Sequence, residues 1–146
     1  MHKRWAQAHP YRRVFDFGAG KRGKVDVWMA AHDISYWPYD PFNRSERENA
    51  KALLNAFLCD VVFCANVLNV VEDKHMHDTL QLLWDITNRT NNRQAFVSVY
   101  HNRSRGPNLQ RKGYIQRNQP LEWYVPLLEA YFTTVVKVGD VLVCTI

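Results

Sequence analysis

Residues 14–24 read Val-Phe-Asp-Phe-Gly-Ala-Gly-Lys-Arg-Gly-Lys, and this stretch decides the fold class of the chain. A short apolar strand leads through one acidic residue into three glycines, Gly18, Gly20 and Gly23. Glycines at a strand-to-helix turn let the backbone approach a ligand closely, as in open α/β sheets that bind nucleotide-like molecules. The stretch therefore predicts an α/β fold with a ligand site at the end of its first strand.

The ligand of such a turn depends on the residues around the glycines. The spacing fits the dinucleotide pattern G-x-G-x-x-G and nearly fits the phosphate loop G-x-x-x-x-G-K-[ST]. Val25 stands where the phosphate loop needs a hydroxyl for Mg²⁺, which disfavours that ligand. Asp16, two residues before Gly18, would repel a pyrophosphate. The same carboxylate suits S-adenosylmethionine (SAM), which carries a sulfonium and an ammonium group.

A second strand is predicted over 34–39, and Asp40 follows it, twenty residues after Gly20. An acidic residue at the tip of the second strand accepts hydrogen bonds from ribose hydroxyls. Pro41 and Phe42 come next, and the phenyl ring is placed where an adenine would stack. This pattern serves SAM and dinucleotides alike.

The rest of the chain alternates between strand and helix patterns. Ser45-x-x-Glu48 is a capping box at the start of a helix, and 61–66 is the continuous apolar run of a strand buried on both faces. Gly139-Asp140 between two β-rich runs predicts a two-residue hairpin loop. The remaining predicted elements are strands at 13–17, 95–100, 133–138 and 141–146, and helices at 23–32, from Asp73 through Thr87, and at 120–132 with a kink at Pro126.

Asp16-x-Gly18-x-Gly20 resembles the first motif of the class I SAM-dependent methyltransferases, and the closing hairpin is also a feature of that superfamily. The resemblance implies one domain over residues 1–146: a minimal Rossmann-like sheet, mostly parallel, with a C-terminal antiparallel hairpin. No strand pattern lies between the helix that starts at Ser45 and the strand at 61–66, so we expect six strands with the family's third strand missing. The resemblance assigns SAM to Asp16, Phe17, Gly18, Ala19, Gly20, Asp40, Pro41, Phe42, Asn66 and Val67.

Two further segments are similar to methyltransferase-like proteins associated with DNA phosphorothioation. The first is 60–73, which contains Val-Leu-Asn-Val at 67–70 and then an acidic helix start. The second is the Gly113-Tyr114-x-Gln116 turn, followed by 121–124. With the first motif, the likeness covers about residues 13 to 146.

The methyl acceptor is much less evident from the residues. Asn66 leaves one central strand and Tyr100 and His101 leave the next, at the edge where open α/β sheets bind ligands. Methyl transfer needs alignment, and a base only if the acceptor must lose a proton. We take His101 as the candidate base, with Tyr100 and Asn66 as orienting groups, although a solvated loop histidine explains His101 equally well. His75 and His77 diverge on a helix, so no metal site is expected.

Charge and composition bear on partners and compartment. The net charge is +5, and no acidic residue lies between Ile86 and Leu121. The basic segments 1–13 and 101–117 therefore suggest a polyanion such as nucleic acid, although a solvated loop fits as well. A partner subunit or a homo-oligomer would supply sequence specificity. Three cysteines without C-x-x-C spacing and the lack of a membrane-length apolar run favour a cytoplasmic protein with no membrane partner.

Three functions follow as alternatives. The first is a SAM-dependent methyltransferase of unidentified acceptor. The second is a non-catalytic SAM-binding module or regulatory subunit that acts with a partner. The third is a nucleotide- or NAD-binding domain, which Asp16 and the terminal hairpin disfavour.

Overall fold

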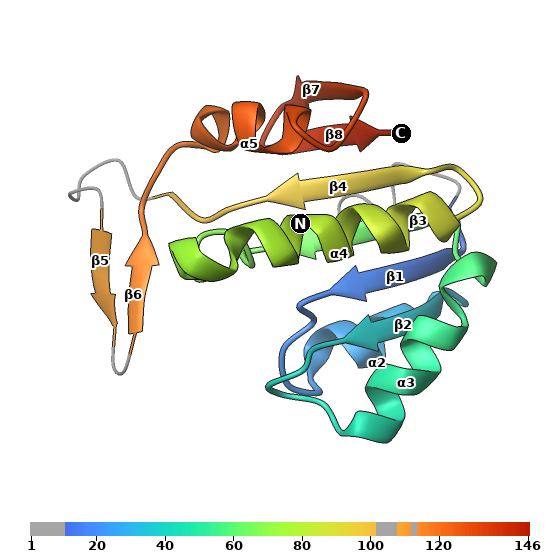
Figure 1. Cartoon of the computed structure of the whole chain (residues 1–146). Coiled ribbons are helices and arrows are strands. Elements are labelled where there is room, and N and C mark those ends of the chain that lie inside the picture. The colour runs from blue at the N-terminus through green and yellow to red at the C-terminus, as the bar shows by residue number, and fades with distance from the viewer. Residues whose placement is uncertain (1–10, 102–107, 112–113) are drawn as a thin grey trace.

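The computed structural model describes residues 11–101, 108–111 and 114–146 (Figure 1). Its centre is a six-stranded mixed sheet in the order β2-β1-β3-β4-β8-β7. The first four strands of that order run parallel to one another, whereas β8 is antiparallel to both β4 and β7. The strands are β1 (Arg13–Phe17), β2 (Ser35–Tyr39), β3 (Val61–Ala65), β4 (Gln94–Ser98), β7 (Thr134–Val138) and β8 (Val141–Thr145).

This sheet confirms the α/β class, the mostly parallel arrangement and the antiparallel C-terminal pair. The connection between β2 and β3, which the structure describes throughout, holds α3 (Glu46–Leu54) and a 3₁₀ turn, η1 (Ala56–Leu58), but no strand. The sheet is thus a Rossmann-like arrangement of six strands. The hairpin loop also forms as predicted, with Gly139 at a φ of +59°.

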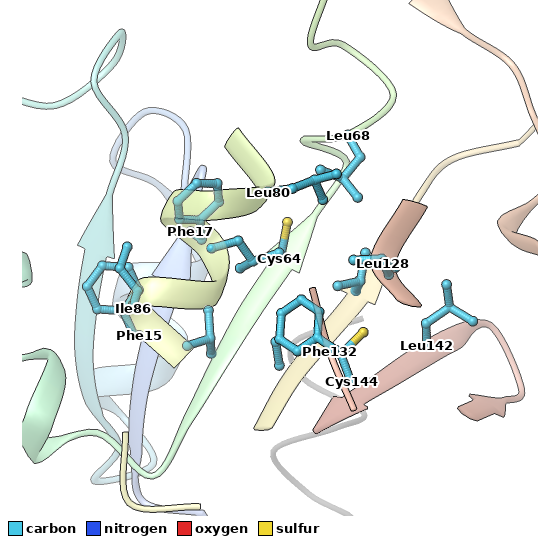
Figure 2. Packing of buried hydrophobic residues seen from close by; sticks show 14 of the residues in the cluster. Phe15, Phe17, Cys64, Leu68, Leu80, Ile86, Leu128, Phe132, Leu142 and Cys144 are labelled. Carbon is cyan, nitrogen blue, oxygen red and sulfur yellow. The ribbon is translucent and has the colours of Figure 1, made fainter. Parts of the chain in front are cut away.

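Helices cover both faces of the sheet. The side chains of Phe15, Phe17 and Cys64 lie on the face covered by α4 (Asp73–Arg89) (Figure 2). They belong to the larger apolar cluster, which also includes Leu128 of α5 (Val125–Glu129). The opposite face carries a smaller cluster that includes Val14 and Phe63 and packs against α2 (Lys24–Ala30). The alternation of buried side chains along β1 is what a strand buried on both faces requires.

Two predicted helices differ from the structure. The predicted helix over 120–132 is divided into a 3₁₀ turn, η2 (Leu121–Tyr124), and α5, because Pro126 has no N–H for an α-helical bond to Glu122. The sequence offers Asp73 as the N-cap of the next helix, but Asp73 is the first residue of α4 and Glu72 is its N-cap. The sequence also places Trp84 on the apolar face of this helix; Trp84 is only half-buried, whereas Ile86 is buried. In contrast, Ser45 and Glu48 form the predicted capping box of α3.

The structure contains a hairpin that the sequence pattern does not predict. Between β4 and η2 the chain forms β5 (Asn108–Arg111) and β6 (Tyr114–Arg117), an antiparallel pair separate from the main sheet. Figure 1 shows the pair projecting beyond the carboxyl ends of the parallel strands. Within the described residues, no helix has the length and apolar character needed to cross a bilayer.

Candidate functional site

The carboxyl ends of the four parallel strands lie at one edge of the sheet, so the turns that follow them are neighbours. The chain passes from β1 to β2 on one side and returns to β3 on the other, which makes the gap between β1 and β3 the switch point of the topology. Ligands of open α/β sheets bind at such a point. The turns after β1 and β3 carry half of the predicted cofactor residues, namely Gly18, Ala19, Gly20, Asn66 and Val67.

Gly18 is where these two turns touch. Its φ is +74°, a left-handed conformation that residues with a side chain rarely adopt. A Cβ atom at this position would lie 2.2 Å from Cγ2 of Val67. Glycine is therefore required twice, by backbone conformation and by the close approach of the turn after β3.

The turn after β1 is also bonded to the tip of β2. The N–H groups of Gly18 and Ala19 both donate to the carbonyl of Tyr39, at 2.8 and 3.1 Å. The N–H of Gly20 donates to Oδ2 of Asp40 at 2.9 Å. Sequence reasoning paired the glycine turn with Asp40 by spacing alone, and the structure brings them into direct contact.

The Asp40 carboxylate is buried, and groups of the protein already donate hydrogen bonds to both of its oxygens. Besides Gly20, it accepts hydrogen bonds from the N–H groups of Phe42 and Asn43, both at 2.9 Å. The side-chain amide of Asn43 donates to both carboxylate oxygens, at 3.1 and 3.2 Å. Asp40 thus organises the loop after β2, a role that the expectation of a free ribose acceptor did not include.

Gly23 has no special role in this turn. Its φ of −176° is extended backbone, and a methyl group at this position would meet no atom closer than a carbonyl oxygen 3.8 Å away. The third glycine of a dinucleotide fingerprint serves close packing of helix and strand. The start of α2 is moreover occupied by the carboxylate of Asp26, which accepts from the N–H of Gly23 at 2.9 Å. Both features disfavour a phosphate-bearing ligand here.

Asp16 lies near the end of β1, where it is only 2% exposed. One of its oxygens accepts a hydrogen bond from the hydroxyl of Tyr36 on β2. Burial, and then the charge of Asp16, raise the pKa of the Tyr36 hydroxyl, so the tyrosine remains a donor. The predicted cation-binding carboxylate is therefore held in place by a neighbouring strand.

Arg44 is hydrogen-bonded to the glycine turn. This residue was not identified as a site residue from the sequence. Its side chain is 2% exposed. Nε donates to the carbonyl of Gly20 at 2.8 Å, and the two terminal nitrogens bind Asp26 at 2.9 and 3.2 Å. Burial alone would raise the pKa of Asp26, but the bonds from Arg44 and Gly23 outweigh it and lower that pKa. No sequence pattern links Arg44 to Gly20.

A hollow of about 400 Å³ adjoins this network on the outer side of β2. Its charged lining is internally compensated, because Arg22 pairs with Glu48 and Arg44 with Asp26. The hollow lies away from the predicted cofactor residues, and its paired charges do not single out a ligand.

The turns after β3 and β4 hold the predicted catalytic residues. Asn66 has a φ of +60°, which asparagine tolerates better than most residues, and its N–H donates to the carbonyl of Ser98 at 2.8 Å. This bond joins the tips of β3 and β4. The side chains of Asn66 and Tyr100 are exposed and His101 is half-exposed, with no hydrogen bond among these three described residues. They share an edge of the sheet but do not form a preassembled constellation.

The predicted adenine-stacking group is fully presented to solvent. Phe42 is 93% exposed and Pro41 is also exposed, whereas Phe17 is buried in the core. An exposed aromatic ring beside an ordered loop has room for a planar ligand on its face. Phe17 in contrast serves packing.

Asn69 is an unexpected polar group at this edge. It is 1% exposed, yet neither its side-chain nitrogen nor its oxygen has a hydrogen-bond partner among the described residues. Leaving such a group unpaired costs about 1 to 3 kcal/mol. Unpaired buried amides are rare in folded proteins, so they require an explanation such as a functional role.

Arg117 on β6 fixes the hairpin to this region. Its N–H donates to the carbonyl of Asn69 at 2.7 Å, and its guanidinium donates to the carbonyl of Leu68 at 2.8 Å and binds Asp73. The guanidinium also lies 5.5 Å from the ring centre of Trp123. The Arg117 guanidinium is therefore engaged by other groups of the protein, contrary to its assignment to a basic surface.

Burial raises the pKa of the nearby Tyr124 hydroxyl, and the guanidinium of Arg117 partly offsets this effect. The hydroxyl is buried without a well-formed hydrogen bond. Asn69 and Tyr124 are thus two poorly paired polar groups close to one arginine.

Comparison with known proteins adds no family assignment. No protein-family model matches the chain, and no curated protein matches it significantly. Among the described residues, no group of three or more histidine, cysteine or acidic side chains is placed to hold a metal ion. Of the predicted basic segments, residues 1–10, 102–107 and 112–113 lie outside the described part of the chain.

Proposed function

We propose that the chain is a SAM-dependent methyltransferase. The observation that carries this proposal is the contact between Gly18 and Val67 at the switch point of the sheet, directly after the buried Asp16. This arrangement places a sterically enforced glycine turn beside an anionic group, which suits a cationic ligand without phosphates. The Asp26 carboxylate at the start of α2 disfavours a phosphate at Gly23, which also favours SAM over a nucleotide.

In this proposal the turn residues Gly18, Ala19 and Gly20 lie against the cofactor, and Asp16 supplies negative charge for its cationic methionine part. Phe42 and Pro41 flank the adenine, while Asn66 and Val67 contact it from the turn after β3. Asp40 binds the ribose only after a ribose hydroxyl replaces the Asn43 amide as a hydrogen-bond donor to its carboxylate. The exposed Asn43 amide bonds both oxygens of Asp40. Its displacement would free one acceptor site for a ribose hydroxyl, because three backbone N–H groups remain bound to the carboxylate.

SAM supplies an electrophilic methyl group when it is bound. The protein then has to align the acceptor with that group and, for a protonated acceptor, to remove one proton. His101 is the proposed base, and Tyr100 and Asn66 orient the acceptor. Because these residues are exposed and unconnected, an acceptor or a partner would have to order them.

We further propose that the acceptor is part of a nucleic acid, on the strength of the basic hairpin region. Arg103, Arg105, Arg111 and Lys112 follow β4 in the sequence. Arg117 is not proposed as a nucleic-acid contact, because its guanidinium binds the carbonyl of Leu68 and the carboxylate of Asp73. Arg13 is removed as well, because it pairs with Asp60 at the opposite edge of the sheet.

The alternative proposal is a SAM-binding module that needs a partner for activity. The lack of any hydrogen bond among Asn66, Tyr100 and His101 favours this alternative. Release of S-adenosylhomocysteine in the presence of nucleic acid distinguishes the two, since only the enzyme forms this product.

The first experiment is calorimetric titration with SAM, S-adenosylhomocysteine, NAD and ATP. Binding of the first two alone supports the proposal, and absence of both overturns it for the isolated chain. Asp16→Asn should reduce SAM affinity at least tenfold while it keeps the size of the side chain and a bond to Tyr36. Asp33→Asn is the matched control, because Asp33 is exposed and asparagine tolerates its φ of 54°.

A further inference from the structure

The two edge strands of the main sheet, β2 and β7, differ in the backbone N–H groups that they leave available for pairing with another strand. At one edge, the N–H of Ser35 on β2 donates to Arg12 at 2.7 Å, and the carbonyl of Tyr39 accepts from Gly18 at 2.8 Å. Alternate residues of a strand face the same neighbour, so the backbone of Tyr36 and Pro38 faces the open edge. Pro38 has no N–H, which prevents a complete ladder with another strand.

The opposite edge, β7, lacks this protection. Ile146 donates to the carbonyl of Arg93 at 3.2 Å, so even-numbered residues of β8 bond toward β4 and odd-numbered ones toward β7. The register of Val138 with Val141 then leaves the backbones of Val135 and Lys137 facing outward. Both keep their N–H groups, and neither bonds to another backbone group of the described residues.

The side chains of β7 do not block pairing either. Val136 and Val138 are 55% and 53% exposed and lie on one face of the strand with Thr134. Lys137 is the strand's single charged residue, and its ammonium group is bound by Glu122 of η2. Edge strands are usually guarded by free charges, prolines or bulges, and β7 offers an apolar face with a neutralised charge instead.

We infer that β7 pairs antiparallel with β7 of a second copy of this chain. The strand is self-complementary when Val136 lies opposite Val136 of the second copy. Val135 then faces Lys137 of the other copy in a hydrogen-bonded pair, and Thr134 faces Val138. The two-fold axis is perpendicular to the sheet, so the exposed valines of both copies form one continuous stripe on the same face.

This dimer does not depend on the proposed cofactor. Five residues on each side make a small interface, well below the standard size of stable complexes. The dimer is therefore expected to dissociate on dilution. Two copies joined in this way would place both proposed sites on one extended sheet, in agreement with a chain that needs a second subunit.

Sedimentation equilibrium over about a hundredfold range of concentration tests the interface. The expected mass rises toward twice the 17.2 kDa of one chain. Lys137→Pro removes one outward N–H and should give a monomer at all concentrations. Lys137→Ala keeps the N–H and loses the same ion pair, so it should still dimerise. A monomeric natural chain, or a dimer that Lys137→Pro leaves unchanged, would overturn the inference.

A cross-link tests the register and is independent of any loss of folding. Residues opposite each other in a non-hydrogen-bonded antiparallel pair have Cα atoms about 4.5 Å apart, within reach of a disulfide. Val136→Cys should therefore form a disulfide-linked dimer under mild oxidation, whereas Thr134→Cys should not. The natural cysteines Cys59, Cys64 and Cys144 are all buried and will not compete. Equal cross-linking of the two variants, or none, would exclude this register.

Discussion

Val67 occupies the space in which a side chain on residue 18 would lie. A Cβ atom there would come within 2.2 Å of Cγ2 of Val67, so the turns after β1 and β3 are in contact only because residue 18 is glycine. These turns flank the switch point of the sheet. Gly18 and Val67 therefore determine how closely the two turns pack, and they form part of the surface of the proposed cofactor site.

Gly18→Ala should destabilise the fold and abolish SAM binding. The substitution combines a clash with Val67 and a strained φ of +74°, for which we expect a loss of about 2 to 4 kcal/mol in unfolding free energy. Denaturant unfolding measures the loss. Gly23→Ala is the control, because its backbone is extended and its surroundings are open. It should lose less than about 1 kcal/mol, since alanine is only a poorer N-cap of α2 than glycine. Equal effects of the two substitutions would contradict this account of the turn.

Substitutions at Asp40 and Asn43 distinguish the structural role of the Asp40 carboxylate from its proposed role in binding the ribose. Asp40→Ala removes a buried acceptor of several hydrogen bonds, so it should reduce both stability, by about 1 to 3 kcal/mol, and SAM affinity, several-fold. Asn43→Ala instead removes only the side-chain amide from the Asp40 oxygens and should leave SAM affinity unchanged or increase it. Titration calorimetry with both variants decides the matter. A loss of affinity in Asn43→Ala would place the ribose elsewhere.

The elements that sequence reasoning placed correctly are those with strong local signals. The apolar run at β3 and the Ser45–Glu48 capping box depend on neighbouring residues, so their pattern is visible in the sequence. The β5–β6 hairpin has no such signal, since its strands are short and polar and carry no apolar alternation. It is fixed instead by Arg117, whose partners lie 44 to 49 residues away along the chain.

The same distinction applies to the site. Spacing placed Gly20 near Asp40, and the structure joins them by a hydrogen bond. Spacing did not indicate that Asn43 occupies the same carboxylate, or that Arg44 reaches back to Gly20, because those contacts depend on how the loop after β2 folds. Identities of candidate residues were accessible from the sequence, whereas their partners were not.

Asn69→Leu should raise stability and lower turnover. Leucine has the same branched shape as asparagine and has no polar atoms to leave unpaired, so the unfolding free energy should rise by about 1 kcal/mol. If the buried amide contacts the methyl acceptor, S-adenosylhomocysteine formation should fall at least tenfold with SAM affinity unchanged. Thermal unfolding and a product assay on one preparation give both values. Full turnover in the stabilised variant would remove Asn69 from the site.

Arg117→Ala should release the hairpin from the sheet. It leaves the carbonyl groups of Leu68 and Val71 without their donor and removes the ion pair with Asp73, at a cost of about 2 kcal/mol. We expect faster proteolysis within residues 101–117. The control is Arg89→Ala, an exposed residue in the last turn of α4. Unchanged cleavage in Arg117→Ala would show that other contacts hold the hairpin.

Asp60 makes the stability of the fold depend on pH in the acid range. It binds the guanidinium of Arg13 at 2.7 Å and the N–H groups of Arg12 and Arg13, so it ties the start of β1 to the start of β3. Burial would raise its pKa, but these hydrogen bonds outweigh burial and hold the pKa below its ordinary 3.8. A carboxyl whose pKa is lower in the folded state stabilises the fold above its unfolded pKa and loses that effect as the pH falls through the folded value.

The unfolding free energy of the natural chain should accordingly decline as the pH falls below about 4. Asp60→Asn should be less stable at pH 7, by about 1 to 3 kcal/mol, with a smaller decline below pH 4, because the group that titrates is gone. Urea unfolding at a series of pH values measures both slopes. Asp33→Asn, at an exposed position, should retain the natural slope. Parallel curves for the natural chain and Asp60→Asn would mean that other carboxylates govern acid unfolding.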